Sequence, residues 1–183
     1  MKSVLISIQP KWCELIASGK KTVEVRKTKP KLDTPFKVYI YATKSGDRLV
    51  LKNDKVFEIS KAITGKVIGE FVCDMVLDFG LDPYGHNSYF ISDDDFESTC
   101  FTLFDEFWEY GKGKPLYGWH ISDLVIYDKP KELSEFYKPC YYMSWCQYKL
   151  LCDAIGYDYF NCGNCENVIT RPPQSWCYVE ELG

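Results

Sequence analysis

Three charged side chains near the start of the chain, Lys21, Glu24 and Arg26, have the types and spacing of a polar binding or catalytic site. Successive side chains of a strand point to opposite faces, so residues 24 and 26 share one face of an extended segment. The long amine of Lys21 can reach over the same face. A carboxylate between two cations can hold anionic or carbonyl oxygens, or accept and return a proton. The sequence therefore predicts either a ligand-binding site or a site of acid–base chemistry.

The residues around these charges predict a short helix followed directly by a strand. Trp12, Leu15 and Ile16 recur at helical spacing behind Pro10. Gly19 suits the left-handed backbone position that ends a helix. The strand then begins near residue 22 and carries the charges on one face and two valines on the other. Local geometry alone is expected to bring the three charges together.

An earlier strand and the helix contribute further candidate ligand contacts. Residues 4–9 alternate and end at a proline, which predicts a first strand entering the helix. Ser7 and Gln9 alternate outward on that strand, where they could bond to a base edge. Trp12 lies between that strand and the charged strand, and aromatic rings of this kind stack on unpaired bases. Ser7, Gln9 and Trp12 are therefore predicted ligand contacts.

Glu70 is a further candidate because its strand, residues 66–73, is apolar on both faces. A carboxylate on such a strand is costly to bury unless it is paired. We expect Lys21 or Arg26 to supply that partner, which places Glu70 in the same cleft as Glu24. The alternative is a buried ion pair that only stabilises the fold.

The spacing Gly19-x-Lys21-x-x-Glu24-x-Arg26 resembles the signature of the ASCH family. The order of strand, Pro-x-Trp helix and motif strand resembles the opening unit of that family, and residues 66–73, 117–124 and 175–179 resemble later strands. The resemblance implies an α+β fold, a PUA-like small mixed, mainly antiparallel β-barrel with flanking helices, in a single domain over residues 1–183. It also implies RNA or a modified nucleoside or nucleotide as the partner.

The same resemblance leaves a hydrolase as the alternative. One branch of the family consists of amidohydrolases acting on N4-acetylcytidine, whose motif lysine acts with a threonine and a glutamate. The corresponding positions here are Lys21, Glu24 and Glu70, which are the catalytic residues if the chain is an enzyme. Glu24 replaces the threonine of that branch, so the hydroxyl chemistry does not transfer unchanged. Other members are linked to ribonuclease activity, for which Lys21, Glu24 or His120 could exchange protons near a phosphate.

The charge is divided unevenly along the chain. The net charge is −4, yet residues 1–66 carry 15 Lys or Arg against 6 Asp or Glu, and residues 67–183 carry 7 against 20. The basic half contains the motif, and Lys27, Lys29 and Lys31 follow it directly. Such a patch attracts phosphate through counterion release. Lysines that merely solvate strands are the alternative interpretation.

Two further segments have predictions of their own. Ser92 and the three aspartates after it are typical of a helix start, and the segment to about Tyr110 predicts one or two acidic amphipathic helices. A protein-interaction module using residues 93–110 is the third functional hypothesis.

No apolar run approaches the about 20 residues that cross a bilayer. The short N-terminal apolar stretch reads as a strand, so we expect a cytoplasmic protein without a membrane partner.

The cysteines predict a structural metal site. Nine cysteines without a secretory signal favour thiols or metal over disulfides. Residues 138–168 are a Cys-rich insertion, in which Cys162 and Cys165 have the spacing of a zinc knuckle. We expect one structural Zn²⁺ held by that pair and two of Cys140, Cys146 and Cys152. Small buried thiols are the alternative.

Overall fold

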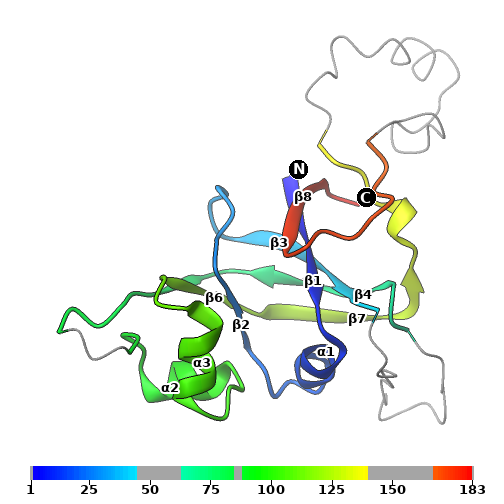
Figure 1. Cartoon of the computed structure of the whole chain (residues 1–183). Coiled ribbons are helices and arrows are strands. Elements are labelled where there is room, and N and C mark those ends of the chain that lie inside the picture. Colours follow the sequence, from blue (N-terminus) through cyan, green and yellow to red (C-terminus); the bar gives the residue numbers. More distant parts are fainter. Residues whose placement is uncertain (1, 45–62, 85–87, 140–166, 183) are drawn as a thin grey trace, which may run out of the picture.

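The computed structural model describes residues 2–44, 63–84, 88–139 and 167–182, whose strands form two sheets (Figure 1). The larger sheet has five strands in the order β7 (Ser122–Lys131), β4 (Val67–Cys73), β3 (Phe36–Ala42), β1 (Lys2–Ile8) and β8 (Trp176–Glu180). The smaller sheet has the order β2 (Val23–Arg26), β6 (Leu116–His120) and β5 (Val76–Phe79). Of the pairs between these strands, β1 with β3 is parallel and the others are antiparallel. The predicted α+β, mainly antiparallel class is therefore correct.

Three α-helices and one 3-10 turn complete the described chain: α1 (Pro10–Ala17), α2 (Asp93–Ser98), α3 (Phe104–Gly111) and η1 (Leu133–Glu135). Figure 1 shows α1 below the end of β1, and α2 and α3 together beside β2 and β6. Ser92 caps α2, since its hydroxyl accepts from the Asp95 N–H at 3.2 Å. The predicted helix start is confirmed, and the predicted helical region consists of two helices.

The turn from α1 into β2 follows the glycine at position 19. Gly19 has φ of +73°, and its N–H donates to the Ile16 carbonyl while Lys20 N–H donates to the Leu15 carbonyl. This pair of bonds is the Schellman arrangement, which satisfies the last carbonyls of a helix. A side chain at residue 19 would be strained at this φ. The predicted helix end is confirmed, and it delivers Lys21 directly to the start of β2.

The core lies on both faces of β1 and under β2. Val4 and Ile6 of β1 pack in one apolar cluster with Trp119, whereas Leu5 packs on the other side with Tyr39. Burying each such side chain contributes about 1.5–3 kcal/mol. The described termini of the chain meet in this sheet, because β1 and β8 pair antiparallel. The strand β1 is therefore the fixed centre from which the site is built.

A third cluster holds the apolar face of β2 against the helices. Val23 and Val25 pack with Phe79 of β5 and Phe107 of α3. Phe96, Phe101 and Trp108 of the same helical region also pack on this cluster. The apolar side of α2 and α3 is thus used within the fold, and it holds the charged face of β2 toward α1.

Two further predictions concern membrane spans and the Cys-rich insertion. No helix in the described ranges is long and apolar enough to cross a membrane. The predicted insertion, residues 138–168, falls almost wholly outside the described residues, as do all five of its cysteines. The zinc site therefore stays a prediction.

Candidate functional site

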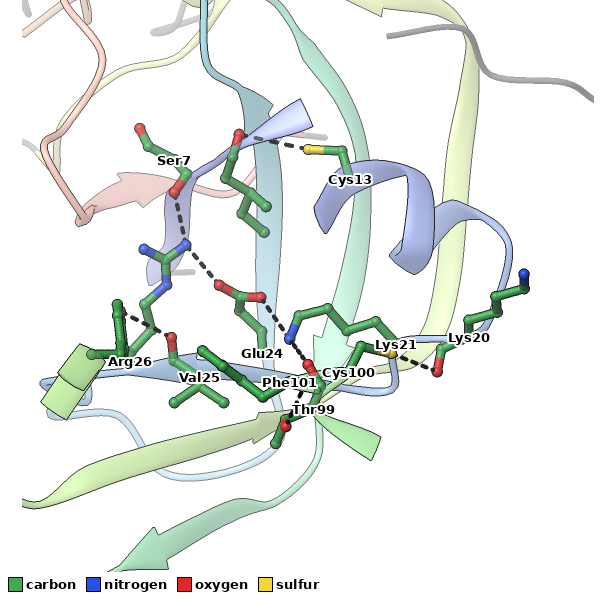
Figure 2. A network of polar contacts seen from close by, with 12 residues as sticks. Ser7, Cys13, Lys20, Lys21, Glu24, Val25, Arg26, Thr99, Cys100 and Phe101 are labelled. Atoms are coloured by element: carbon green, nitrogen blue, oxygen red, sulfur yellow. Dashed lines mark hydrogen bonds and ion pairs between the residues drawn. The ribbon is translucent and has the colours of Figure 1, made fainter. Parts of the chain in front are cut away.

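Glu24 lies between the two cations of the motif (Figure 2). Its Oε1 is 2.9 Å from Nη2 of Arg26, and its Oε2 is 3.6 Å from Nζ of Lys21. The exposed fractions are 2% for Lys21, 5% for Glu24 and 8% for Arg26. The expected sharing of one strand face by residues 24 and 26 is confirmed, with Val23 and Val25 on the opposite face. Three charges are buried together, and a buried cluster of this kind needs each charge to be paired.

Each cation also binds a backbone carbonyl of another element. Nη2 of Arg26 donates to the Ser7 carbonyl of β1 at 2.7 Å. Nζ of Lys21 donates to the Thr99 carbonyl, which follows α2, at 2.5 Å. These bonds join β2 to the large sheet on one side and to the helical region on the other. The charges therefore have fixed positions, which is what a preorganised site requires.

A buried donor of Arg26 has no partner among the described residues. The Nε atom of Arg26 is buried and has no hydrogen-bond partner among the described residues. A buried N–H without an acceptor costs about 1–3 kcal/mol. An acceptor oxygen supplied from outside the protein would remove that cost. Arg26 is thus placed to receive a carbonyl, carboxylate or phosphate oxygen.

Lys21 is enclosed by aromatic rings as well as by charges. Its Nζ lies 4.9 Å from the ring centroid of Trp12 and 5.9 Å from that of Phe101. Burial lowers the pKa of the Lys21 amine from its ordinary value, and the positive charge of Arg26 lowers it further. Glu24 acts in the opposite direction. Because burial is the largest of these effects, the amine loses its proton more readily than a solvated lysine does.

These residues line an open cleft of about 1330 Å³. The structure brings together at this cleft the predicted residues Ser7, Gln9, Trp12, Lys21, Glu24 and Arg26. The parallel pair β1 and β3 ends at the cleft, because Ser7, Tyr41 and Thr43 also line it. This volume is somewhat above the range of about 300–1,000 Å³ that is typical of small-molecule sites.

Some cleft residues had no signal in the sequence. Phe101 and Tyr110 come from the helical region, and the Tyr110 hydroxyl donates to the Val25 carbonyl at 3.3 Å. Residues 172–175 form another wall, where the Ser7 hydroxyl donates to the Pro173 carbonyl at 2.6 Å. These contacts join residues 85 and 166 positions apart, respectively. No local pattern could have predicted them.

Glu70 does not take the place that the sequence predicted. Its Oε1 is 3.2 Å from Nζ of Lys37, and its Oε2 accepts a short hydrogen bond from the Tyr127 hydroxyl. Lys37 in turn pairs with Glu181 at 3.3 Å. The expectation that Glu70 is paired is correct, but the expected partners Lys21 and Arg26 are wrong. Glu70 is not among the residues that line the cleft.

The different location of Glu70 has a structural cause. The pairing of β4 with β7 shifts register between Val67 and Gly69 and again between Glu70 and Val72. Glu70 lies opposite Tyr39 of β3, on the side of the sheet where Tyr39 packs with Leu5. The cleft charges lie on a different sheet. Regular alternation along the sequence does not reveal this shift.

His120, a candidate for proton exchange, is also outside the cleft. Its Nδ1 lies 2.6 Å from Oδ1 of Asp74, and the side chain is 35% exposed. The hydrogen bond from His120 lowers the pKa of the Asp74 carboxyl. This exposed pair fastens the end of β6 to the turn before β5, and it does not contact the charge cluster.

Known proteins share the fold of this chain. The crystal structure of ASCH from Zymomonas mobilis superposes with a TM-score of 0.56 at 17% identity, covering 98% of this chain and 88% of that chain. A tyrosine-to-phenylalanine variant of that protein gives a TM-score of 0.55 at 17% identity, covering 99% and 92%. A serine-to-alanine variant gives 0.54 at 16% identity, covering 98% and 89%. No curated protein sequence matches the chain.

The family assignment rests on the sequence itself. The family model of the ASCH domain matches residues 6–140, which include the end of β1, all of α1 and β2, and both α2 and α3. The predicted family is therefore confirmed over most of the chain. This protein belongs to the ASCH domain family.

Proposed function

We propose that this chain binds RNA, or a modified nucleotide or nucleoside, in the cleft above Lys21, Glu24 and Arg26, on a PUA-like β-barrel. The single observation that carries the proposal is the buried Nε of Arg26, which has no acceptor among the described residues. Both oxygens of Glu24 are paired within the protein, and Lys21 and Arg26 each also donate to a backbone carbonyl. An oxygen of a base or phosphate would complete the set.

The lining of the cleft supports a nucleic-acid ligand. Lys11, Lys27 and Lys44 are exposed cations at its edge, and cations there attract phosphate. Trp12 and Tyr110 offer aromatic rings of the kind on which unpaired bases stack. The family that the chain belongs to is associated with RNA, which agrees with this lining.

Fluorescence anisotropy with a labelled single-stranded RNA pool of randomised sequence tests the proposal. Lys21→Ala combined with Arg26→Ala removes two cleft cations and should weaken binding by about tenfold or more. The matched control combines Lys129→Ala with Lys138→Ala, two exposed lysines outside the cleft lining, and should bind nearly as the wild type does. Equal affinities for the two double variants would contradict the proposal.

A second variant guards against loss of folding. Arg26→Lys keeps the positive charge beside Glu24 but removes the guanidinium fork that carries Nε. We expect it to retain the circular-dichroism spectrum of the wild type and to bind RNA more weakly. Unchanged RNA affinity in this variant would show that the unpartnered Nε has no role in binding.

A hydrolase is the second candidate, favoured by the lowered pKa of the Lys21 amine. An amine with a lowered pKa gives up its proton more readily than a solvated lysine and can act as a base or nucleophile. The threonine of the amidohydrolase branch is replaced by Glu24, whose two oxygens face Lys21 and Arg26. Incubation with N4-acetylcytidine and with labelled RNA decides between the candidates. Turnover that disappears in Lys21→Ala supports the hydrolase, and binding without turnover supports the binding protein.

A further inference from the structure

Two apolar side chains at the start of α3 are left uncovered by the fold. Leu103 is the N-cap of α3 and Phe104 its first residue, and they are 59% and 52% exposed. The Phe104 ring stacks on Phe96 of α2, with centroids 4.0 Å apart and planes 9° apart. Phe96 in turn packs on the buried Phe107, with centroids 5.7 Å apart. Phe104 is thus supported by the core through Phe96, while its outer side and Leu103 are open to solvent.

Carboxylates surround these two apolar side chains. On α2, Asp93 lies one turn before Phe96, and residues three apart on a helix are neighbours. On α3, Asp105 follows Phe104 directly. The exposed members of this surface, which we call the outer helical face, are Asp93, Asp94, Glu97, Leu103, Phe104 and Asp105. None of the six lines the cleft, so this face is separate from the site around Glu24.

The carboxylates of the outer helical face are not paired with cations in the described part of the chain. Residues 81–111 contain eight Asp or Glu and no Lys or Arg. The ion pairs among the described residues involve carboxylates of other elements. Carboxylates gathered without counter-charges produce a negative potential that attracts cations. The apolar centre of the face favours cations that are accompanied by apolar side chains.

The two helices that carry this face have fixed positions in the fold. The Thr22 N–H donates to the Ser98 carbonyl at the end of α2 at 3.1 Å. On α3, the Tyr110 hydroxyl donates to the Val25 carbonyl at 3.3 Å. Figure 1 shows α2 and α3 together beside β2 and β6. A surface that is ordered before binding loses little conformational entropy when a partner arrives.

We propose that the outer helical face binds a basic amphipathic segment of a partner protein. An apolar side chain of that segment covers Leu103 and Phe104, and its Lys or Arg side chains pair with the surrounding carboxylates. A cation of the segment can also lie over the Phe104 ring. Charge complementarity selects this occupant, since the carboxylates repel an acidic segment or a nucleic acid. The inference is independent of the ligand of the cleft.

Fluorescence anisotropy with defined peptides tests the proposal. The probe is a labelled helical peptide of about 14 residues, with leucine at positions three or four apart and lysine at the remaining positions. One comparison peptide has serine in place of each leucine, and the other has glutamate in place of each lysine. We expect the probe to bind the wild-type protein at least about tenfold more tightly than either comparison peptide. Equal affinity for the serine peptide would show attraction by charge alone and would overturn the proposal.

Variants of the apolar centre locate the bound probe. Leu103→Ser combined with Phe104→Ser should weaken probe binding by about tenfold or more. Val125→Ser, at a side chain of β7 that is 49% exposed, is the matched control and should bind the probe as the wild type does. Leu103→Ser alone guards against loss of folding, because Leu103 is not among the residues packed on the third cluster. It should keep the wild-type circular-dichroism spectrum and weaken probe binding several-fold, and an affinity equal to that of Val125→Ser would contradict the proposal.

Variants of the carboxylates test the charge complementarity. Asp94→Asn combined with Asp105→Asn should weaken probe binding by about tenfold and reduce its dependence on salt. Asp33→Asn combined with Asp128→Asn, two exposed carboxylates outside the helical region, is the matched control and should retain wild-type binding. Equal losses in the two double variants would show that only the net charge matters and would overturn the proposal.

The two glutamates on the cleft side of α3 separate this face from the cleft. Glu106 and Glu109 are exposed and line the cleft. Glu106→Gln combined with Glu109→Gln should weaken probe binding less than the Asp94 and Asp105 variant does. A larger loss would place the peptide in the cleft and overturn the proposal.

Sedimentation velocity separates a partner protein from a second copy of this chain. Residues 1–66 carry 15 Lys or Arg against 6 Asp or Glu, so a second copy is the competing occupant. A monomer that binds the probe agrees with the proposal, as does a dimer that persists when Leu103 and Phe104 are both replaced. A dimer that this double variant converts to a monomer would show that a second copy covers the face, and the proposal would be overturned.

Discussion

Nη2 of Arg26 lies 2.9 Å from Oε1 of Glu24, and the same nitrogen donates to the Ser7 carbonyl at 2.7 Å. One guanidinium edge thereby joins β2 to β1 across the two sheets. Glu24 is held by Arg26 on one oxygen and by Lys21 on the other. The carboxylate is the central member of the cluster, because removing it leaves two buried cations unpaired.

Replacing Glu24 should therefore destabilise the protein more than replacing an exposed glutamate would. We expect Glu24→Ala to lower the free energy of unfolding by about 3–5 kcal/mol, the usual effect of breaking a buried ion pair. Glu14→Ala, an exposed glutamate on α1, is the control and should change it by about 0.5 kcal/mol or less. Urea denaturation measures both. Similar small effects in the two variants would mean that the cluster contributes little to stability.

The lowered pKa of Lys21 predicts a pH dependence of stability. Burial lowers the pKa of the folded amine, whereas the unfolded chain has the ordinary value of 10.5. Between these values the unfolded state binds more protons, so this group makes the free energy of unfolding rise with pH. The free energy of unfolding of the wild type minus that of Lys21→Met should increase from about pH 7 to about pH 10, as measured by urea denaturation. A constant or falling difference would contradict a lowered pKa.

Glu70 is predicted to matter for stability and not for binding. Glu70→Gln removes a partly buried charge that Lys37 and Tyr127 contact, and we expect a loss of about 1–2 kcal/mol in the free energy of unfolding. Tyr127→Phe removes the hydrogen bond that Oε2 of Glu70 accepts. Because both substitutions act on one contact, the double variant should lose less than the sum of the two single losses. RNA affinity should stay at the wild-type value in all three variants. A tenfold loss of affinity in Glu70→Gln would restore Glu70 to the site.

The zinc prediction is tested by metal analysis. Protein purified without chelator should contain about one zinc per chain, held by Cys162, Cys165 and two of Cys140, Cys146 and Cys152. Cys162→Ser combined with Cys165→Ser should lose the metal, whereas Cys177→Ser, a half-buried thiol on β8, should keep it. Wild-type protein without stoichiometric zinc would rule out the site.

The parts of the site that the sequence predicted are those set by local geometry. Gly19 ends α1 and the period of β2 aligns Glu24 with Arg26, so these positions follow from residues adjacent in sequence. Phe101 could not be predicted, because it reaches Lys21 only through the packing of the helical region. Glu70 was assigned wrong partners because register shifts in β4, which a sequence pattern does not show, decide which side chains it meets.

The wall formed by residues 172–175 has a consequence for the biosynthesis of the protein. Ser7 N–H donates to the Ser175 carbonyl at 2.8 Å, so the cleft combines the first strand of the chain with a segment made more than 160 residues later. A nascent chain in which this segment has not yet been synthesised lacks that wall. In such a chain, the edge of β1 that later pairs with β8 is unpaired. A chaperone or a second nascent chain could occupy that edge first. Newly made copies therefore complete this cleft only after residues 172–175 have been made.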